Sequence, residues 1–170
     1  DAAVIENVLN GREGVSIANY NCPGQIVITG EAAAVAEAGT ALKEAGARRV
    51  LPLKVSGPFH SPMMRPAGEE LAKVFARVSM NPLKIPYVAN INAEVITDCG
   101  RIEGLLVEQV SGSVRWQQSV ETMIREGVDT FVEIGPGKTL TGFLRKIDKN
   151  VKAYHIGSWE EAVQVCEELK

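Results

Sequence analysis

The chain has 170 residues, of which 45% are hydrophobic and 23% charged, a composition that is ordinary for a globular protein. Its net charge of −3 gives no electrostatic reason to expect binding to nucleic acid or to a membrane surface. No apolar run approaches the ~20 residues of a membrane helix and the first residues do not resemble a signal peptide, so we expect a cytoplasmic protein. Three distant cysteines, Cys22, Cys99 and Cys166, and only two histidines favour reduced thiols and predict no metal site.

The first third of the chain predicts the order helix, strand, strand, helix, strand. The predicted elements are, in order, residues 2–9, 15–20, 26–29, 31–45 and 49–55. A Pro-Gly turn joins the first two strands, and Gly46 can end the second helix. One more strand at the start would complete the ferredoxin-like βαββαβ pattern. We therefore expect residues 1–56 to form a ferredoxin-like small subdomain whose first strand is absent.

The rest of the chain, residues 57–170, alternates helices with strands, which favours a mainly parallel sheet. Ser61 and Pro62 suit the N-cap and the first position of a helix, and apolar residues keep helical spacing from there to Val78. The later predicted elements are strands at 85–91, 131–134 and 152–156 and helices at 102–110, 116–125, 139–147 and 159–169.

A glycine-rich turn at residues 135–139, Gly-Pro-Gly-Lys-Thr, invites comparison with phosphate-binding loops. The Walker pattern needs a glycine where Val132 stands, and a dinucleotide fingerprint needs one where Leu140 stands. Backbone N–H groups at the start of the following helix could still hold an anion. The residues favour a structural turn.

His60 is the first candidate catalytic residue. It lies between the predicted strand 49–55 and the helix start at Ser61, and α/β proteins usually bind ligands in loops at the carboxyl ends of strands. A neutral imidazole in such a loop can act as a general base. The alternative is a loop histidine that only bonds to backbone. His155, inside a short apolar strand, favours a structural role.

Further polar residues are candidates for binding or positioning. Gln109 occupies the next position of the apolar stripe of helix 102–110, where it needs a partner or caps the helix end. Asn19 and Asn21 lie two apart, so we expect them on one strand face, where they orient a polar substrate or satisfy each other. Arg48 and Arg49 either contact a phosphate or are simply solvated.

A histidine base needs a nucleophile, and the sequence does not provide an evident one. No serine of the chain lies in a Gly-x-Ser-x-Gly elbow, and no cysteine has an activating context. We therefore expect that these 170 residues do not contain a complete nucleophile–base pair.

Three motifs resemble those of the malonyl-CoA:acyl-carrier-protein transacylase family and occur in the same order. They are residues 19–30 (NYNCPGQIVITG), 55–64 (VSGPFHSPMM) and 131–140 (FVEIGPGKTL). The resemblance runs almost from end to end. It implies an α/β fold in which residues 57–170 form the C-terminal part of an α/β-hydrolase-like acyltransferase core and residues 1–56 an incomplete ferredoxin-like subdomain.

The resemblance also implies an activity, which is malonyl transfer from malonyl-CoA to the phosphopantetheine thiol of acyl carrier protein in fatty acid biosynthesis. The mechanism is a ping-pong Ser/His mechanism with a coenzyme A thioester as substrate and no cofactor. The implied partners are malonyl-CoA, acyl carrier protein and the N-terminal part of the same enzyme, which carries the serine, so this chain is expected to be inactive alone. The alternatives are an acyltransferase fragment of a polyketide or fatty-acid megasynthase and a non-catalytic fragment that only binds carrier protein.

Residue roles follow from the same resemblance. His60 matches the general base, and Gln109 matches the residue whose backbone carbonyl accepts the histidine's other N–H. Phe59 matches a position that favours malonyl over methylmalonyl. The remaining matches are Asn19 and Asn21 on the pantetheine path and Arg48 and Arg49 at coenzyme A or carrier-protein phosphates. Without the N-terminal part, apolar faces should lie uncovered, lined by Leu51, Leu53, Val55, Val88, Phe131 and Ile134.

Overall fold

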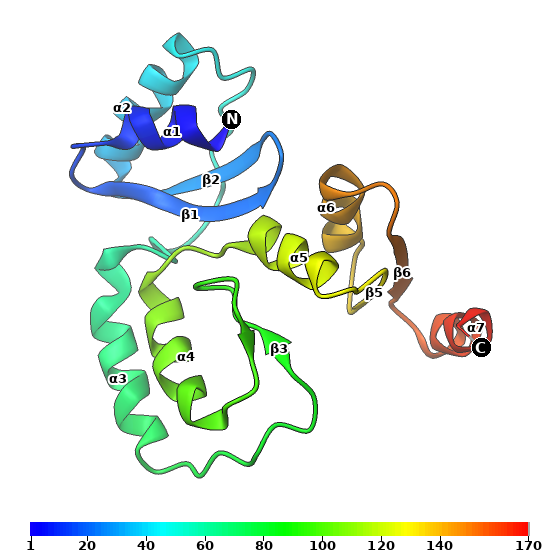
Figure 1. Cartoon of the computed structure of the whole chain (residues 1–170). Helices are drawn as coiled ribbons and strands as arrows, with labels where there is room; N and C mark the ends of the chain where they lie inside the picture. The colour runs from blue at the N-terminus through cyan, green and yellow to red at the C-terminus, as the bar shows by residue number, and fades with distance from the viewer. Residues whose placement is uncertain (170) are drawn as a thin grey trace.

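The structure is a computed structural model that describes residues 1–169. It is a mixed α/β chain in which the elements form three groups in chain order (Figure 1). The first group, in blue and cyan, contains a β-hairpin with two helices. The second, in green, contains a helical pair, and the third, from yellow to red, carries the C-terminus. In the described part of the chain, no helix is both long and apolar enough to cross a membrane.

The first group is an antiparallel hairpin covered by two helices (Figure 1). Its elements are α1 (Ala2–Leu9), β1 (Val15–Cys22), β2 (Gln25–Gly30) and α2 (Ala32–Glu44). Gly24 turns the hairpin with φ +77°, as a type II turn requires at this position. Gly46, with φ +94°, ends α2 by donating to the carbonyl of Lys43, while Ala47 donates to Leu42. These four elements confirm the sequence predictions.

The predicted strand at 49–55 is wrong. Residues 51–55 form no regular secondary structure, and their one backbone hydrogen bond among themselves runs from Val55 N–H to the Leu53 carbonyl. An alternating pattern becomes a strand only when a neighbour supplies ladder hydrogen bonds, and no strand in residues 1–169 pairs with this segment. Pro52 also lacks an N–H to donate. The ferredoxin-like division at residue 56 stays a prediction.

The second group is built on two packed helices (Figure 1). Its elements are η1 (Pro62–Met64), α3 (Arg65–Phe75), β3 (Tyr87–Val88), β4 (Val95–Ile96), η2 (Cys99–Arg101) and α4 (Ile102–Ser111). Gly68 on α3 lets α4 approach closely, since a β-carbon there would lie 3.1 Å from the Val107 carbonyl oxygen. The helix beginning at Ser61 is confirmed, but its first turn is 3₁₀ and it ends at Phe75 rather than Val78.

The predicted strand at 85–91 shortens to two residues, Tyr87–Val88, which pair with Val95–Ile96. Pro86 cannot donate to a ladder and so limits the strand on one side. Ala93, with φ +59°, lies in the loop between the two strands. The sequence patterns did not predict this small antiparallel pair.

The third group contains the parallel part of the fold. Its elements are α5 (Trp116–Arg125), β5 (Thr130–Ile134), α6 (Thr139–Ile147), β6 (Lys152–Ile156) and α7 (Trp159–Glu168). Strand β5 pairs in parallel with β6, and α6 forms the crossover between them. All five elements confirm the predicted ones closely. The mainly parallel sheet expected for residues 57–170 is nevertheless not found, because residues 57–169 contain two separate two-stranded sheets, of which β5–β6 is parallel and β3–β4 is antiparallel.

The segment between α4 and α5 ties the first group to the second. Val114 forms a parallel bridge beside Asn19: its N–H donates to the Ala18 carbonyl at 2.7 Å, and its carbonyl accepts from Tyr20 N–H at 2.8 Å. The Ser113 hydroxyl donates to the Ile17 carbonyl at 2.5 Å. Strand β1 is therefore fixed against the end of α4.

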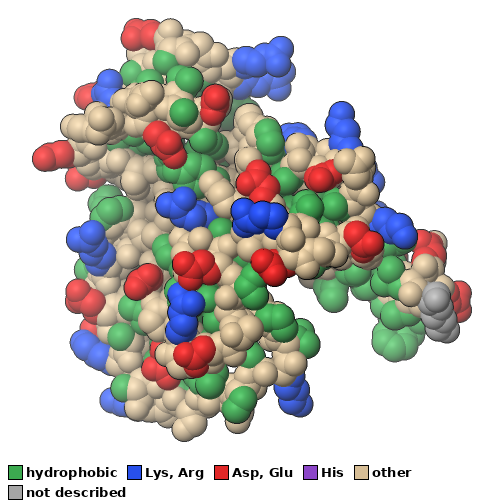
Figure 2. All heavy atoms as spheres, in the orientation of Figure 1, with side chains coloured by type: hydrophobic (Ala, Val, Ile, Leu, Met, Phe, Trp, Pro, Cys, Tyr) green, Lys and Arg blue, Asp and Glu red, His purple; other side chains and the backbone are tan. Residues whose placement is uncertain are grey.

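Charged side chains of both signs are interspersed over the face shown in Figure 2, with apolar side chains between them. Several large apolar residues are exposed, as expected from the sequence. Leu51, Leu53 and Val55 are 72%, 61% and 64% exposed, and Ile134 is 78% exposed. Val88 and Phe131, which were expected to behave in the same way, are partly buried.

Candidate active site

The loop that carries His60 is held in an unusual backbone conformation. His60 has φ +58°, in the left-handed region that few non-glycine residues adopt. Ser61, only 1% exposed, bonds on both sides of it: its hydroxyl donates to the Pro58 carbonyl at 2.7 Å and accepts from Met63 N–H at 3.3 Å. Strained residues of this kind persist only where the surroundings hold them, and they cluster at functional sites.

The ring of His60 is oriented by a backbone carbonyl. Its Nδ1 lies 3.1 Å from the carbonyl oxygen of Gln109 at the end of α4. A carbonyl oxygen only accepts hydrogen bonds, so this contact selects the neutral tautomer with the proton on Nδ1, in which Nε2 has a free lone pair. This is the tautomer that a general base requires. The contact that the family resemblance implied is therefore present, although the strand expected just before the loop is not.

The side chain of Gln109 also forms hydrogen bonds. Both expected roles of Gln109 therefore have a contact in the structure: a side chain at the helix end and a backbone carbonyl facing His60. Its Nε2 donates to the Gly112 carbonyl at 2.9 Å and approaches the Ser113 carbonyl at 3.4 Å. The side chain closes the end of α4 while the backbone carbonyl faces His60.

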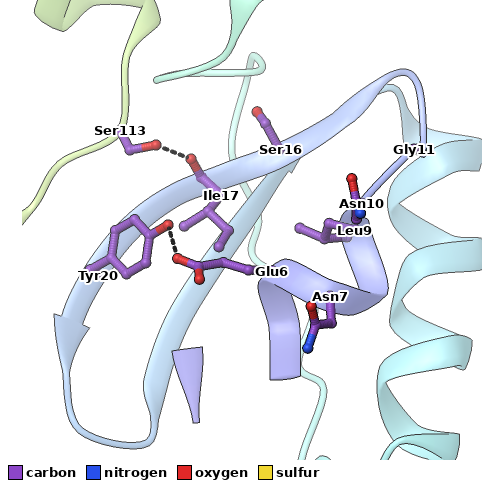
Figure 3. Close-up of a pocket in the computed structure, with 9 residues that line it drawn as sticks. All are labelled: Glu6, Asn7, Leu9, Asn10, Gly11, Ser16, Ile17, Tyr20 and Ser113. Carbon is purple, nitrogen blue, oxygen red and sulfur yellow. Dashed lines mark hydrogen bonds between the residues drawn. The ribbon is translucent and has the colours of Figure 1, made fainter. Parts of the chain in front are cut away.

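Asn19 and Asn21 lie on a strand that is less regular than its sequence suggests. The β1–β2 register shifts at Ala18 and again at Asn21. Neighbouring strand residues point to opposite faces, so Asn19 lies opposite Tyr20. Figure 3 shows Tyr20 and Ile17 pointing to the same side of β1. Within residues 1–169, neither amide hydrogen-bonds to the other.

The remaining candidates are Phe59, which adjoins His60 in the sequence, and Arg48 and Arg49, which precede it by about a dozen residues. Phe59 precedes His60 and is 49% exposed. Arg48 and Arg49 are exposed in the turn after α2. No ion pair in the described part of the chain involves either arginine. The structure thus brings Phe59, His60 and Gln109 together, with Asn19 tied to the segment after Gln109.

Glu133 is a residue that the sequence patterns missed. Its carboxylate accepts hydrogen bonds from Leu140 N–H at 3.0 Å, from Thr141 N–H at 2.7 Å and from the Thr141 hydroxyl at 2.6 Å. Burial alone raises the pKa of this carboxyl, but these donors outweigh it and hold the pKa below its ordinary value. The anion at the glycine-rich turn is therefore Glu133. The sequence signal that could have identified Glu133 was an acidic residue just before a glycine-rich turn that begins a helix.

His155 has contacts that suit a structural role. Its Nε2 lies 2.9 Å from the Gly135 carbonyl, and its Nδ1 lies 3.5 Å from a carboxylate oxygen of Glu161. Glu161 also accepts from Gly157 N–H at 2.6 Å. The ring joins the glycine-rich turn to α7.

Two open pockets lie near β1, and neither is lined by His60 or Gln109. The first, of about 530 Å³, lies between α1 and β1 and includes Ser113 (Figure 3). There the Tyr20 hydroxyl donates to Glu6 at 2.9 Å, and burial together with this bond raises the pKa of Tyr20. The second, of about 470 Å³, borders the histidine loop at Ser61, Pro62 and Met63. No cluster of three potential metal ligands occurs in residues 1–169.

The fold and this site define an α/β protein in which an imidazole is oriented by a backbone carbonyl instead of a carboxylate. Residues 1–165 match the acyl transferase domain family, and the chain belongs to that family. It is 42% identical, over 156 residues, to the malonyl CoA-acyl carrier protein transacylase of Bacillus subtilis. That match covers 92% of this chain and 49% of the relative. The chain spans about half the length of the curated relatives it matches.

Solved structures agree with this assignment. The crystal structure of MCAT from Streptococcus pneumoniae is similar, with a TM-score of 0.92 and 42% identity over 98% of this chain and 55% of that one. A type II PKS acyl-carrier protein in complex with its malonyl-transacylase has a TM-score of 0.90 and 37% identity, covering 98% and 53%. The resemblance noted from the three sequence motifs is confirmed.

Proposed function

We propose that this chain supplies the general base of a malonyl-CoA:acyl-carrier-protein transacylase. The enzyme transfers malonyl from malonyl-CoA to the phosphopantetheine thiol of acyl carrier protein in fatty acid biosynthesis. The observation that carries the proposal is the 3.1 Å contact between His60 Nδ1 and the Gln109 carbonyl oxygen. The names of the relatives support the substrate, and the similar complex with an acyl-carrier protein supports the partner.

The first half-reaction acylates a serine. The 170 residues contain no Gly-x-Ser-x-Gly elbow, so the serine belongs to the N-terminal part of the same enzyme. Its hydroxyl oxygen attacks the malonyl thioester carbonyl while its proton passes to His60 Nε2. The carbon–sulfur bond then breaks, and coenzyme A leaves as a thiol with the proton from His60. The Gln109 carbonyl dipole faces the positive charge that the ring carries between these steps.

The second half-reaction transfers the malonyl group from the serine to the carrier protein by the same type of proton transfer. His60 Nε2 takes the proton of the phosphopantetheine thiol, and the sulfur attacks the malonyl-serine ester. The ester bond breaks and the serine oxygen regains the proton from His60. The chain thus handles each proton of the cycle, with the coenzyme A thioester as substrate and no cofactor.

The surrounding residues have supporting roles in this proposal. The exposed ring of Phe59 crowds the acyl α-carbon and favours malonyl over the bulkier methylmalonyl. Asn19 and Asn21 line the pantetheine path, and Arg48 and Arg49 meet phosphate groups of coenzyme A or the carrier protein.

The finer architecture belongs to the same proposal. Residues 57–170 form part of an α/β-hydrolase-like core, whose parallel β5–α6–β6 unit supports this assignment. Residues 1–56, with a helix-flanked antiparallel hairpin, form an incomplete ferredoxin-like subdomain.

Labelling with radioactive malonyl-CoA tests the division of roles. We expect the isolated chain to form no covalent malonyl adduct, and we expect an adduct on the serine of the N-terminal part once that part is added. A stoichiometric adduct on this chain alone contradicts the proposal. An assembled pair that folds yet never becomes labelled favours the non-catalytic carrier-binding alternative.

A further inference from the structure

Gln109 has a carbonyl that is free because its helix ends early. In an α-helix each carbonyl accepts from the N–H four residues later, so the partner of Gln109 would be Ser113. Helix α4 instead ends at Ser111, and Gly112 is extended with φ −102° and ψ 158°. In the described residues, the N–H of Gly112 still donates to the Glu108 carbonyl, but the N–H of Ser113 forms no hydrogen bond to the Gln109 carbonyl. The carbonyl of Gln109 is thus left for His60 Nδ1.

The side chain of Gln109 stabilises the extended conformation of residues 112–113. Its amide nitrogen lies 2.9 Å from the Gly112 oxygen and 3.4 Å from the Ser113 oxygen. Both partners are acceptors, so only the NH₂ end of the amide can face them. The amide oxygen is buried and finds no donor in residues 1–169, so the amide is held through its nitrogen alone.

Other contacts fix the far side of the same segment. The Ser113 hydroxyl and the backbone of Val114 bond to β1, as described above. Gly112 also lies so close to Ile91 that a β-carbon at Gly112 would overlap the Ile91 side chain. The Gln109 amide adds a contact from the helix end itself, through the carbonyls of Gly112 and Ser113.

We propose that the side chain of Gln109 is a positioning group for the base, because it keeps its own backbone carbonyl free for His60. Without the amide donor, residues 112–113 can relax towards another helical turn, and Ser113 N–H then competes with His60 for the Gln109 carbonyl. The His60 ring loses its orienting partner and populates both tautomers. This inference rests on the proposed function for its kinetic consequence, but its structural consequence does not.

The test uses the complete transacylase and replaces only the side chain. Gln109→Met keeps the length and removes the donor, whereas Gln109→Lys restores a donor that can reach the two carbonyls. Gln117→Met is the matched control, since the Gln117 amide donates to Glu121 on the exposed surface of α5. The ¹⁵N spectrum of the His60 ring reports its tautomer, and single-turnover acylation at saturating malonyl-CoA reports the base.

We expect His60 to be protonated at Nδ1 in the unaltered enzyme and in Gln117→Met. In Gln109→Met the Nδ1–H population falls and acylation slows about threefold to tenfold, the size expected for one lost hydrogen bond, with KM little changed. Gln109→Lys recovers both readouts. If Gln109→Met does not fold, Gln109→Asn, whose shorter amide cannot reach the carbonyls, replaces it with the same expected changes.

Two results overturn the inference. One is a His60 ring protonated at Nε2 in the unaltered enzyme, and the other is a folded Gln109→Met with an unchanged tautomer. Because the tautomer is read without turnover, an enzyme that transfers no malonyl yet shows these tautomer changes refutes the proposed function and leaves the inference standing.

Discussion

Removing the charge of Glu133 tests the assignment of this carboxylate as the anion that holds the start of α6. Glu133→Gln keeps the side-chain length but places an NH₂ group against at least one of the three donors from Leu140 and Thr141. Hydrogen bonds to a charged group contribute about 1.5–3 kcal/mol, and loss of a helix cap costs about 0.5–2 kcal/mol. The carboxylate is partly exposed, so we expect the free energy of unfolding to fall by about 1–2 kcal/mol at pH 7.

The pH dependence of this loss has a definite sign. The folded-state pKa of Glu133 lies below its ordinary value, so its contribution is present above the unfolded-state pKa of about 4.3. It disappears as the pH falls through the lower folded-state pKa. The difference between the original chain and Glu133→Gln should therefore shrink in acid.

Urea unfolding of the two proteins at pH 7 and in acid measures this difference. Glu121→Gln is the matched control, because within residues 1–169 the Glu121 side chain accepts only from Gln117, on the exposed surface, and such changes usually alter stability by less than about 0.5 kcal/mol. A loss at pH 7 no larger than in the control, or one that persists unchanged in acid, would refute the capping role.

Three further changes probe other parts of the account. Phe59→Ser in the complete transacylase should raise the ratio of methylmalonyl to malonyl transfer by about tenfold or more, since one methyl group is worth roughly 1–3 kcal/mol of discrimination, and an unchanged ratio places selectivity elsewhere. Ser61→Ala removes the hydroxyl that bonds on both sides of His60, so thermal unfolding should show a loss of about 1–2 kcal/mol; an unchanged midpoint would mean that the loop is held by other contacts. Leu53→Ser, in the exposed apolar segment, should reduce self-association of the isolated chain in sedimentation velocity, and a well-folded monomer before the change would contradict this expectation.

Local signals in the sequence were enough to predict most of the helices. Residues 116–125 and 139–147 carry apolar residues at helical spacing, and the observed helices Trp116–Arg125 and Thr139–Ile147 begin and end at the same positions. Ser61 was recognisable as an N-cap because capping depends on the residue and its immediate neighbours.

Features that depend on a distant partner were harder to predict. Residues 49–55 alternate like a strand, but a strand also needs a neighbouring ladder, which no local pattern specifies. The register shift between Ile17 and Asn19 has no marker in the sequence either.

The candidate site shows the same limit. His60 and Gln109 are 49 residues apart, and the bond between them joins a ring to a backbone carbonyl that every residue type possesses. The helical stripe could therefore mark Gln109 as a polar residue in need of a partner, but it could not name His60 as that partner. Only the family resemblance assigned the Gln109 backbone carbonyl to His60.

The most direct test of the central claim is single-turnover acylation by the complete transacylase carrying His60→Ala. Loss of a general base costs about 10²–10⁴-fold in rate, so we predict a fall of at least that size with the fold retained. His155→Gln is the control, because the contacts of the His155 ring in the described residues are to the Gly135 carbonyl and Glu161 rather than to His60 or Gln109, so the acylation rate should stay near normal. Near-normal acylation by a folded His60→Ala enzyme would show that another residue is the base and would contradict the account.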